Sequence, residues 1–361
     1  MLSAQKKSRN YFIELLRFFF AVLILLYHGL AFLAPDSSFL RCTNGAVAVE
    51  FFFILSGFLM ANSAKKKIGD TANIGKDSVD FIKKKYLSVF PYHLFSYVCS
   101  FIVAVILGSL TVVGAVKLFV NSLPNLFMLD MVGLPYTMVA GYVWFVSAML
   151  IAMAVLYPIL RRWFSVFTNI IAPVLGVLLL GWLAQTYGRL TYISFWTGLT
   201  FKGVLRAVAE IAFGCAAFAL CERLKERDFT KFGKLVLSLL ELFGYAATFV
   251  YAFSRKSETF YFYLVFFLTV SIAVSFSGQT LTSHLRNNKL VSFLGKLSLP
   301  VYLNQYYVYL MGERYTKHLN GNVRLLLFAG ISLVMAIICL LLVDFLRKKI
   351  NISKLLVQKT A

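Results

Sequence analysis

The sequence predicts an all-α polytopic integral membrane protein with about ten transmembrane helices and both termini in the cytoplasm. Of its 361 residues, 60% are hydrophobic and 14% are charged, whereas a soluble globular chain is nearer half apolar and a quarter charged. The mean hydropathy is +0.78. Apolar stretches long enough to cross roughly 30 Å of hydrocarbon recur from end to end. The basic residues lie between these stretches, in the segments expected to connect transmembrane helices.

The ten predicted helices follow from where polar residues interrupt the apolar runs. They are residues 10–33, 46–62, 86–108, 142–160, 164–183, 201–221, 234–253, 260–277, 291–311 and 322–346. The first run contains Glu14 and Arg17 where a signal peptide would be purely apolar, so we expect it to be a retained helix. Residues 109–141 include Pro124 and Pro135 and predict a loop with an amphipathic piece near the membrane surface.

The distribution of Lys and Arg fixes the orientation. With the N-terminus inside, the segments on the cytoplasmic side hold 23 of these residues and those on the outer side hold 7, as the positive-inside rule predicts. We therefore interpret the net charge of +21 as topology and contact with anionic lipid in the bilayer, and expect no nucleic-acid partner. Residues 10–346 form one membrane domain, and residues 347–361 form a short basic cytoplasmic tail.

The five cysteines predict neither a disulfide framework nor a zinc site, because their number is odd and no CxxC pair occurs. Four of them lie in or beside apolar segments and are interpreted as packing residues. We expect no metal site, so if the chain is an enzyme, its chemistry must come from the histidine system described next.

Ionisable residues in the first helix are candidates for function, because burying them in a membrane is costly. Arg17 and His28 are eleven residues apart, which places them on one face at 100° per residue. Their axial separation is roughly 16 Å, so a polar stripe crosses most of the membrane. Glu14 lies three residues before Arg17 and is a candidate partner. Taken singly, His28 would be an interfacial histidine and Arg17 a snorkelling cation, and the shared face weakens both alternatives.

Glu50 in the second helix lies about one turn from the outer end, at a depth similar to that of His28. A carboxylate beside an imidazole fixes its tautomer and raises its basicity, which suits a general base. The alternative is that Glu50 pairs with Arg41 in the adjoining loop. Ser56 and Gly57, further down the helix, favour close helix packing.

Two further charged groups are candidates. Lys83, Lys84 and Lys85 at the mouth of the third helix either contact lipid or hold a phosphorylated ligand, and spacing does not separate these alternatives. Arg206 and Glu210 form an i, i+4 pair that should face the protein interior or a water-filled cavity. The aromatic residues expected to line such a cavity, or to anchor helices at the interface, are Trp144, Tyr302, Tyr306 and Tyr307.

The first two helices resemble the membrane acyltransferase-3 family. That family begins with an acidic residue, Arg, ten residues and His, which are Glu14, Arg17 and His28 here. It continues with V-[DE]-x-F-F-x-x-S-G-F. The residues that fill this second pattern are Val49, Glu50, Phe52, Phe53, Ser56, Gly57 and Phe58.

Later segments extend the resemblance to residues 10–346. The segment around Trp144 and Pro158 looks like the fourth helix of the family, and LGKLSLPVYLNQ, with Ser298 and Tyr302, looks like the ninth. The chain departs from the family pattern at four positions. They are Lys85 and Ser88, where the family often has two arginines, Met149, where many relatives have Glu, and Gln305, where a late motif ends in His.

The resemblance implies an O-acyltransferase of the O-acetyltransferase type. It would move an acyl group from cytoplasmic acyl-CoA, above all acetyl-CoA, to a hydroxyl of an envelope polysaccharide or lipid-linked sugar. His28 would act as the general base with Glu50 beside it, and Arg17, Lys84 and Lys85 would bind the donor. The supporting residues would be Glu14, Ser56, Trp144, Arg206, Ser298 and Tyr302. No permanently bound cofactor is expected, and the bacterial cytoplasmic membrane is the expected location.

An alternative function remains open at this point. A transporter or flippase for a glycan or small anion also places Arg, Glu and His inside the membrane. The two helix motifs favour the enzyme, and no internal repeat of the kind found in many transporters is evident in the sequence.

Overall fold

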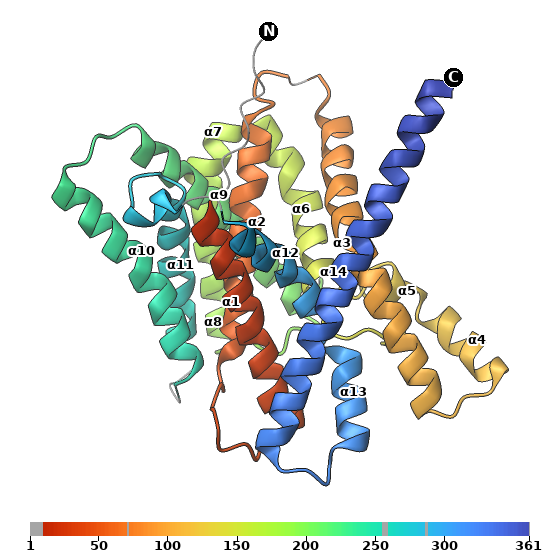
Figure 1. Cartoon of the computed structure of the whole chain (residues 1–361). Helices are drawn as coiled ribbons and strands as arrows, with labels where there is room; N and C mark the ends of the chain where they lie inside the picture. Colours follow the sequence, from red (N-terminus) through yellow and green to blue (C-terminus); the bar gives the residue numbers. More distant parts are fainter. Residues whose placement is uncertain (1–9, 71, 255–258, 286–287, 361) are drawn as a thin grey trace.

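The computed structural model describes residues 10–70, 72–254, 259–285 and 288–360, and over these ranges the chain is helical, with no β-strand. The helices form a bundle with α1 and α12 at its front in Figure 1. They are α1 Tyr11–His28, α2 Ala48–Lys65, α3 Ile74–Leu107, α4 Val112–Asn121, α5 Leu123–Leu126, α6 Trp144–Arg162, α7 Phe164–Val166, α8 Ala172–Tyr187, α9 Lys202–Lys225, α10 Lys231–Ala252, α11 Thr259–Ser275, α12 Lys289–Leu303, α13 Tyr306–Tyr315 and α14 Gly321–Thr360. Short 3-10 or π turns are Gly29–Leu33, Gly45–Val47, Phe167–Ile171 and Leu281–His284.

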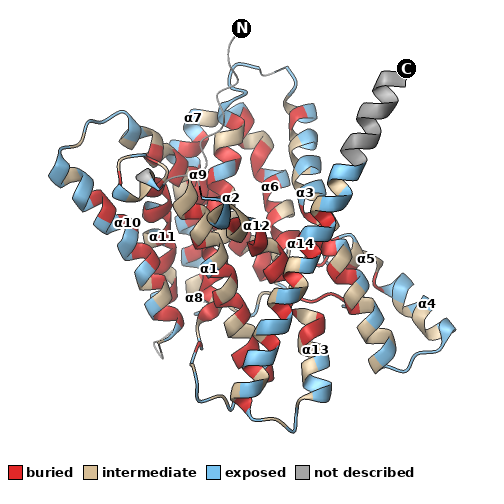
Figure 2. Ribbon diagram, in the orientation of Figure 1, coloured by how far each residue is buried: buried red, intermediate tan, exposed pale blue. Residues whose placement is uncertain are grey.

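Eight helical segments of the described chain are long and apolar enough to cross a membrane. Large apolar side chains such as Phe243 of α10 and Leu341 of α14 are exposed on the outside of the bundle. Figure 2 shows this contrast between a buried interior and exposed outer helix faces. A soluble protein does not expose so much apolar surface, whereas hydrocarbon accommodates it. The chain is therefore an all-α, multi-pass membrane protein, as predicted.

The helix bounds differ from the sequence prediction in three places. α3 begins at Ile74 rather than residue 86, because the charged residues before the apolar run are themselves good helix formers. The segment predicted as one helix over 291–311 is interrupted at Asn304 and Gln305. α14 continues to Thr360, so the predicted tail prolongs this helix. A short helix, α4, occupies part of the predicted loop over 109–141, in agreement with the expected amphipathic piece.

α2 and α9 pack at the centre of the bundle through glycines. A Cβ atom on Gly57 would overlap the carbonyl oxygen of Ile211, and one on Gly214 would overlap the carbonyl oxygen of Ile54. The two backbones therefore touch, which is how small residues bring membrane helices together. This contact fits the packing interpretation of the Ser56–Gly57 step and fixes the position of Glu50, two turns away on α2.

α1 and α12 lie side by side and run in the same direction. Near the start of α1, the Glu14 carboxylate occupies the space over Gly295 of α12. At the other end, His28 contacts Gln305, just beyond the end of α12. The face of α1 that carries the polar stripe therefore follows α12 along its length.

Candidate active site

His28 lies where α1 changes from an α-helix to a π-helical turn over Gly29–Leu33. Such turns are frequent at functional sites. Gly29 allows this turn to approach α14, since a Cβ atom there would lie 2.8 Å from the Phe328 ring. The imidazole is thus placed at a fixed break in the helix rather than on a regular turn.

The hydrogen bonds of Gln305 assign the tautomer of His28. Gln305 Nε2 donates to the Val301 carbonyl oxygen at 3.0 Å, so its Oε1 faces His28 Nδ1 at 2.8 Å. Because Oε1 can only accept, Nδ1 must carry the hydrogen and Nε2 must hold the lone pair. Gln305 is completely buried, which keeps this arrangement in place. The neutral imidazole therefore presents a proton acceptor at Nε2, as a general base requires.

Tyr142 covers the imidazole. The rings of His28 and Tyr142 are stacked, with centroids 3.8 Å apart and planes 8° from parallel. Tyr142 has a φ of 67°, a left-handed conformation that is uncommon for a bulky residue and often occurs at functional sites. The Tyr302 hydroxyl donates to its carbonyl oxygen, and the Tyr306 ring meets its ring edge-on at 5.6 Å. Three tyrosines thus restrict the orientation of His28.

A cavity of about 790 Å³ opens beside the imidazole. Its volume is in the range of small-molecule sites, which are mostly apolar with a few placed polar groups. The lining includes His28, Asp130, Tyr142, Trp144, Thr191 and Arg206. The structure thus brings together the predicted residues His28, Trp144, Arg206 and Tyr302 around one space.

Glu50 does not orient His28, contrary to the prediction. Its Oε1 accepts from Arg206 Nη2 at 2.5 Å, and its Oε2 lies 3.4 Å from Arg206 Nε. Arg206 also bonds Glu210 at 2.9 Å and the Tyr261 hydroxyl at 2.9 Å. Glu50 bonds Arg206 instead of His28 because the buried guanidinium of Arg206 requires anions beside it. The alternative pairing of Glu50 with Arg41 is excluded for the same reason.

Arg206 supplies a buried cation to the cavity wall. Its side chain is 2% exposed, and its guanidinium lies 5.7 Å from the Trp144 ring centroid. Since Glu50 and Glu210 both bond Arg206, the cluster brings two carboxylates to one cation. The expected i, i+4 pair is confirmed, and it is part of a larger network than the sequence indicated.

The predicted donor-side residues lie nearer the start of α1, away from the walls of this cavity. Arg17 Nη1 pairs with Glu14 Oε2 at 3.1 Å, and its side chain is 32% exposed. Lys85 is half-buried and lies close enough to Arg17 for the two charges to repel each other. Lys84 is exposed. Arg17 and Lys85 thus form a cationic pair at this end of the bundle.

Two predicted supporting serines make local contacts. Ser56 Oγ donates to Met149 Sδ at 3.4 Å, so the methionine that replaces the family's Glu is its partner. Ser298 Oγ bonds the Gly295 carbonyl oxygen of its own helix at 2.8 Å. Both serines therefore contribute to helix packing around the site rather than to its cavity.

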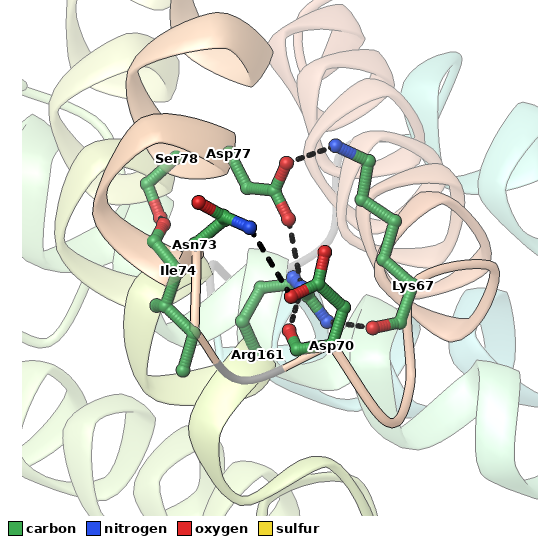
Figure 3. A network of polar contacts seen from close by, with 7 residues as sticks. All are labelled: Lys67, Asp70, Asn73, Ile74, Asp77, Ser78 and Arg161. Carbon is green, nitrogen blue, oxygen red and sulfur yellow. Dashed lines mark hydrogen bonds and ion pairs between the residues drawn. The ribbon is translucent and has the colours of Figure 1, made fainter.

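A second polar network, remote from His28, fixes the start of α3 (Figure 3). Arg161, which is 4% exposed, donates to the carbonyl oxygens of Lys67 and Asp70 and to Asp77 Oδ2, the last two at 2.7 Å. Lys67 pairs with the other oxygen of Asp77, and this hydrogen bond raises the pKa of Lys67. The network holds the turn between α2 and α3 against the end of α6. The network thereby fixes the position of the first turn of α3, the helix that carries Lys85.

Sequence reasoning missed three contributors to the site. Asp130 lies in the segment interpreted as a loop, Tyr142 is the first residue of the predicted helix 142–160, and Gln305 was noted only as a departure from the family pattern. The sequence contained only weak signals for these residues. Asp130 is the single acidic residue of an otherwise largely apolar segment, MLDMV, and the partner of His28 lies 277 positions away in the chain.

Comparison with known proteins identifies a family. A family model described as an acyltransferase domain, of the acyltransferase-3 type, matches residues 10–344. No curated protein and no solved structure matches the chain. Within the described residues, no group of three or more His, Cys, Asp or Glu side chains is arranged to hold a metal ion.

Proposed function

Because the chain belongs to the acyltransferase-3 family, and is thus a membrane acyltransferase, we propose that it transfers an acyl group from cytoplasmic acyl-CoA to a hydroxyl of an envelope polysaccharide or lipid-linked sugar. The acetyl group is the acyl group we propose, and the bacterial cytoplasmic membrane is the proposed location. The observation that carries the proposal is the hydrogen bond between His28 Nδ1 and Gln305 on the wall of the cavity, which leaves Nε2 as the ring nitrogen available to accept a proton.

The proposed reaction is a direct transfer. His28 Nε2 takes the proton of the sugar hydroxyl, and the hydroxyl oxygen attacks the carbonyl carbon of the thioester. A C–O bond forms, the C–S bond breaks, and the leaving thiolate takes the proton from the imidazolium. The neutral imidazole is thereby restored. A general base of this kind contributes about 10²–10⁴-fold to the rate.

The surrounding residues have positioning roles in this proposal. Gln305 fixes the tautomer through Nδ1, and Tyr142 holds the plane of the ring. Glu50 positions Arg206 instead of His28. Arg17 and Lys85 would meet the phosphates of the donor, because two neighbouring cations that repel each other gain free energy when an anion binds between them.

The test compares the envelope glycan of a strain lacking the protein with that of strains carrying His28→Ala or His318→Ala. We expect loss of ester-linked acyl groups in the deletion strain and in His28→Ala. His318 is exposed, so its variant is the matched control and should retain acylation. Acylation by His28→Ala at the wild-type level would contradict the assigned base. Lost export of an unmodified glycan would instead support the transporter alternative.

A further inference from the structure

Two buried polar atoms on the cavity wall lack a hydrogen-bond partner within the described residues. They are Oδ2 of Asp130 and Oγ1 of Thr191. Both residues line the cavity beside His28, and they come from different loops, one before α6 and one before α9. Buried polar atoms are nearly always hydrogen-bonded, so an unpartnered one calls for an explanation. A bound ligand that supplies the missing partners is such an explanation, since both residues line the same space.

The carboxyl group of Asp130 is held rigidly. Its Oδ1 accepts from Asn125 Nδ2 at 2.6 Å, and the residue is 5% exposed. Asn125 is itself fixed, because its side chain bonds the backbone of Val139 and Ala140 at 2.7 to 3.1 Å. The next backbone N–H, that of Met131, donates to a serine hydroxyl at 3.0 Å. The Tyr136 side chain also interacts with this carboxyl group. With Oδ1 bonded to Asn125 and the backbone anchored on both sides, Oδ2 is the oxygen that retains capacity for a ligand.

The chemistry of the two atoms selects the ligand class. Burial raises the pKa of Asp130 to about 6, so the group is mostly ionised at neutral pH and accepts O–H or N–H donors. A threonine hydroxyl both donates and accepts. The rest of the wall is largely aromatic, including Tyr142, Trp144 and Tyr302. A ligand with several hydroxyls on a compact, partly apolar ring matches this pattern, whereas a carboxylate or phosphate would be repelled by Asp130.

We propose that Asp130 and Thr191 are the acceptor-binding residues, which hold hydroxyls of the saccharide while a further hydroxyl reaches His28. This inference rests on the proposed acyl transfer and adds where the acceptor binds. Asp130 accepts a hydrogen bond from one saccharide hydroxyl through Oδ2, and Thr191 bonds a second through Oγ1. Two loops that are distant in the sequence thereby determine which saccharide is used.

The test uses the purified full-length protein, acetyl-CoA, and envelope polysaccharide from which esters have been removed with mild base. Transfer to the polysaccharide and acceptor-free hydrolysis of acetyl-CoA are measured in parallel. We expect Asp130→Asn and Thr191→Val each to raise the KM for the polysaccharide about tenfold, the effect of losing one good hydrogen bond. The kcat and the hydrolysis of acetyl-CoA should stay near the wild-type values, because in this proposal neither residue binds the donor or transfers the proton.

Matched controls separate binding from folding. Asp36→Asn and Thr137→Val alter residues outside the cavity wall and should leave the KM unchanged. Unchanged KM in both cavity variants would overturn the acceptor site. An equal loss of transfer and hydrolysis would also overturn it, because that pattern indicates a structural role. If the wild-type protein neither hydrolyses acetyl-CoA nor acylates the polysaccharide, the proposed function itself fails.

Discussion

Nδ1 of His28 lies 2.8 Å from Oε1 of Gln305, and the carboxamide of Gln305 is oriented by its second hydrogen bond, to the carbonyl oxygen of Val301. In the proposed reaction, a buried amide thus takes the place of the carboxylate that usually fixes a catalytic imidazole. An amide acceptor selects the tautomer without placing a further buried charge in the membrane, where charges are costly.

This relationship predicts different effects for two substitutions at Gln305. Gln305→Leu removes the acceptor, so Nδ1 loses its partner and the imidazole can adopt the other tautomer. We expect acyl transfer to fall about 10²-fold, within the range that a general base contributes. Gln305→Glu retains an acceptor and should keep most of the activity. The measurement is the rate of acetyl transfer by membranes with matched protein content, and equal rates for Gln305→Leu and wild type would refute the role.

The stacked ring of Tyr142 predicts a requirement for glycine at position 141. A Cβ atom on Gly141 would overlap the Tyr306 ring, so Gly141→Ala must displace the loop that carries Tyr142. We expect transfer to fall about tenfold or more, because small displacements of positioning residues are costly in catalysis. Gly181→Ala is the control, since a Cβ atom there has no neighbour within 4 Å. Wild-type transfer by Gly141→Ala would show that the loop position is unimportant.

The Arg206 cluster predicts a large loss of stability when its cation is removed. Arg206→Met leaves Glu50 and Glu210 as buried carboxylates without a cation, and breaking a buried pair in this way costs about 3–5 kcal/mol. We expect a lower melting temperature in detergent and less protein in the membrane. Adding Glu50→Gln and Glu210→Gln should restore much of the stability, because the unpaired charges are then gone. Arg223→Met, an exposed position on the same helix, serves as the control.

The network in Figure 3 predicts a protease-sensitive turn when Arg161 is lost. Arg161→Ala removes the three hydrogen bonds that hold the segment between α2 and α3. We expect faster trypsin cleavage after Lys66 or Lys67 in vesicles with this face exposed. The neighbouring Arg162 is exposed, so Arg162→Ala should leave the cleavage rate unchanged. Identical cleavage rates in the two variants would contradict a role of Arg161 in fixing the turn.

The pKa of Asp130 predicts a pH-dependent stability. Because burial raises this pKa from 3.8 to about 6, the folded state favours the neutral carboxyl. Its contribution to stability is fully present below pH 3.8 and is lost as the pH rises through about 6. The titratable side chains whose charges interact with it are Tyr136 of the same loop and Tyr302 of α12, and both are uncharged in this range.

We therefore expect the melting temperature of Asp130→Asn, relative to wild type, to increase between pH 4.5 and pH 7. The substituted amide cannot ionise, so it escapes the penalty that the carboxylate meets at the higher pH. The measurement is thermal unfolding of the detergent-solubilised protein across this range, with Asp228→Asn, at an exposed position between α9 and α10, as the control. A difference between Asp130→Asn and wild type that does not change with pH would exclude the raised pKa.

The sequence by itself determined the class of the protein and the polar face of its first helix. Apolar runs of membrane length and their alternation with charge follow directly from composition. The shared face of Arg17 and His28 follows from helix geometry alone, because both residues belong to one element. The pairing of Arg206 with Glu210 is equally local and was predicted for the same reason.

Only the tertiary structure decided which partners these residues have. Glu50 was expected beside His28 from its depth in the neighbouring helix, but Arg206 on a third helix holds it. Gln305 reaches His28 because the segment predicted as a single helix is interrupted after Leu303. Helical periodicity specifies the depth and direction of a side chain on its own helix. The hydrogen-bond partner depends instead on how distant helices pack, where they break, and which buried charges must be neutralised.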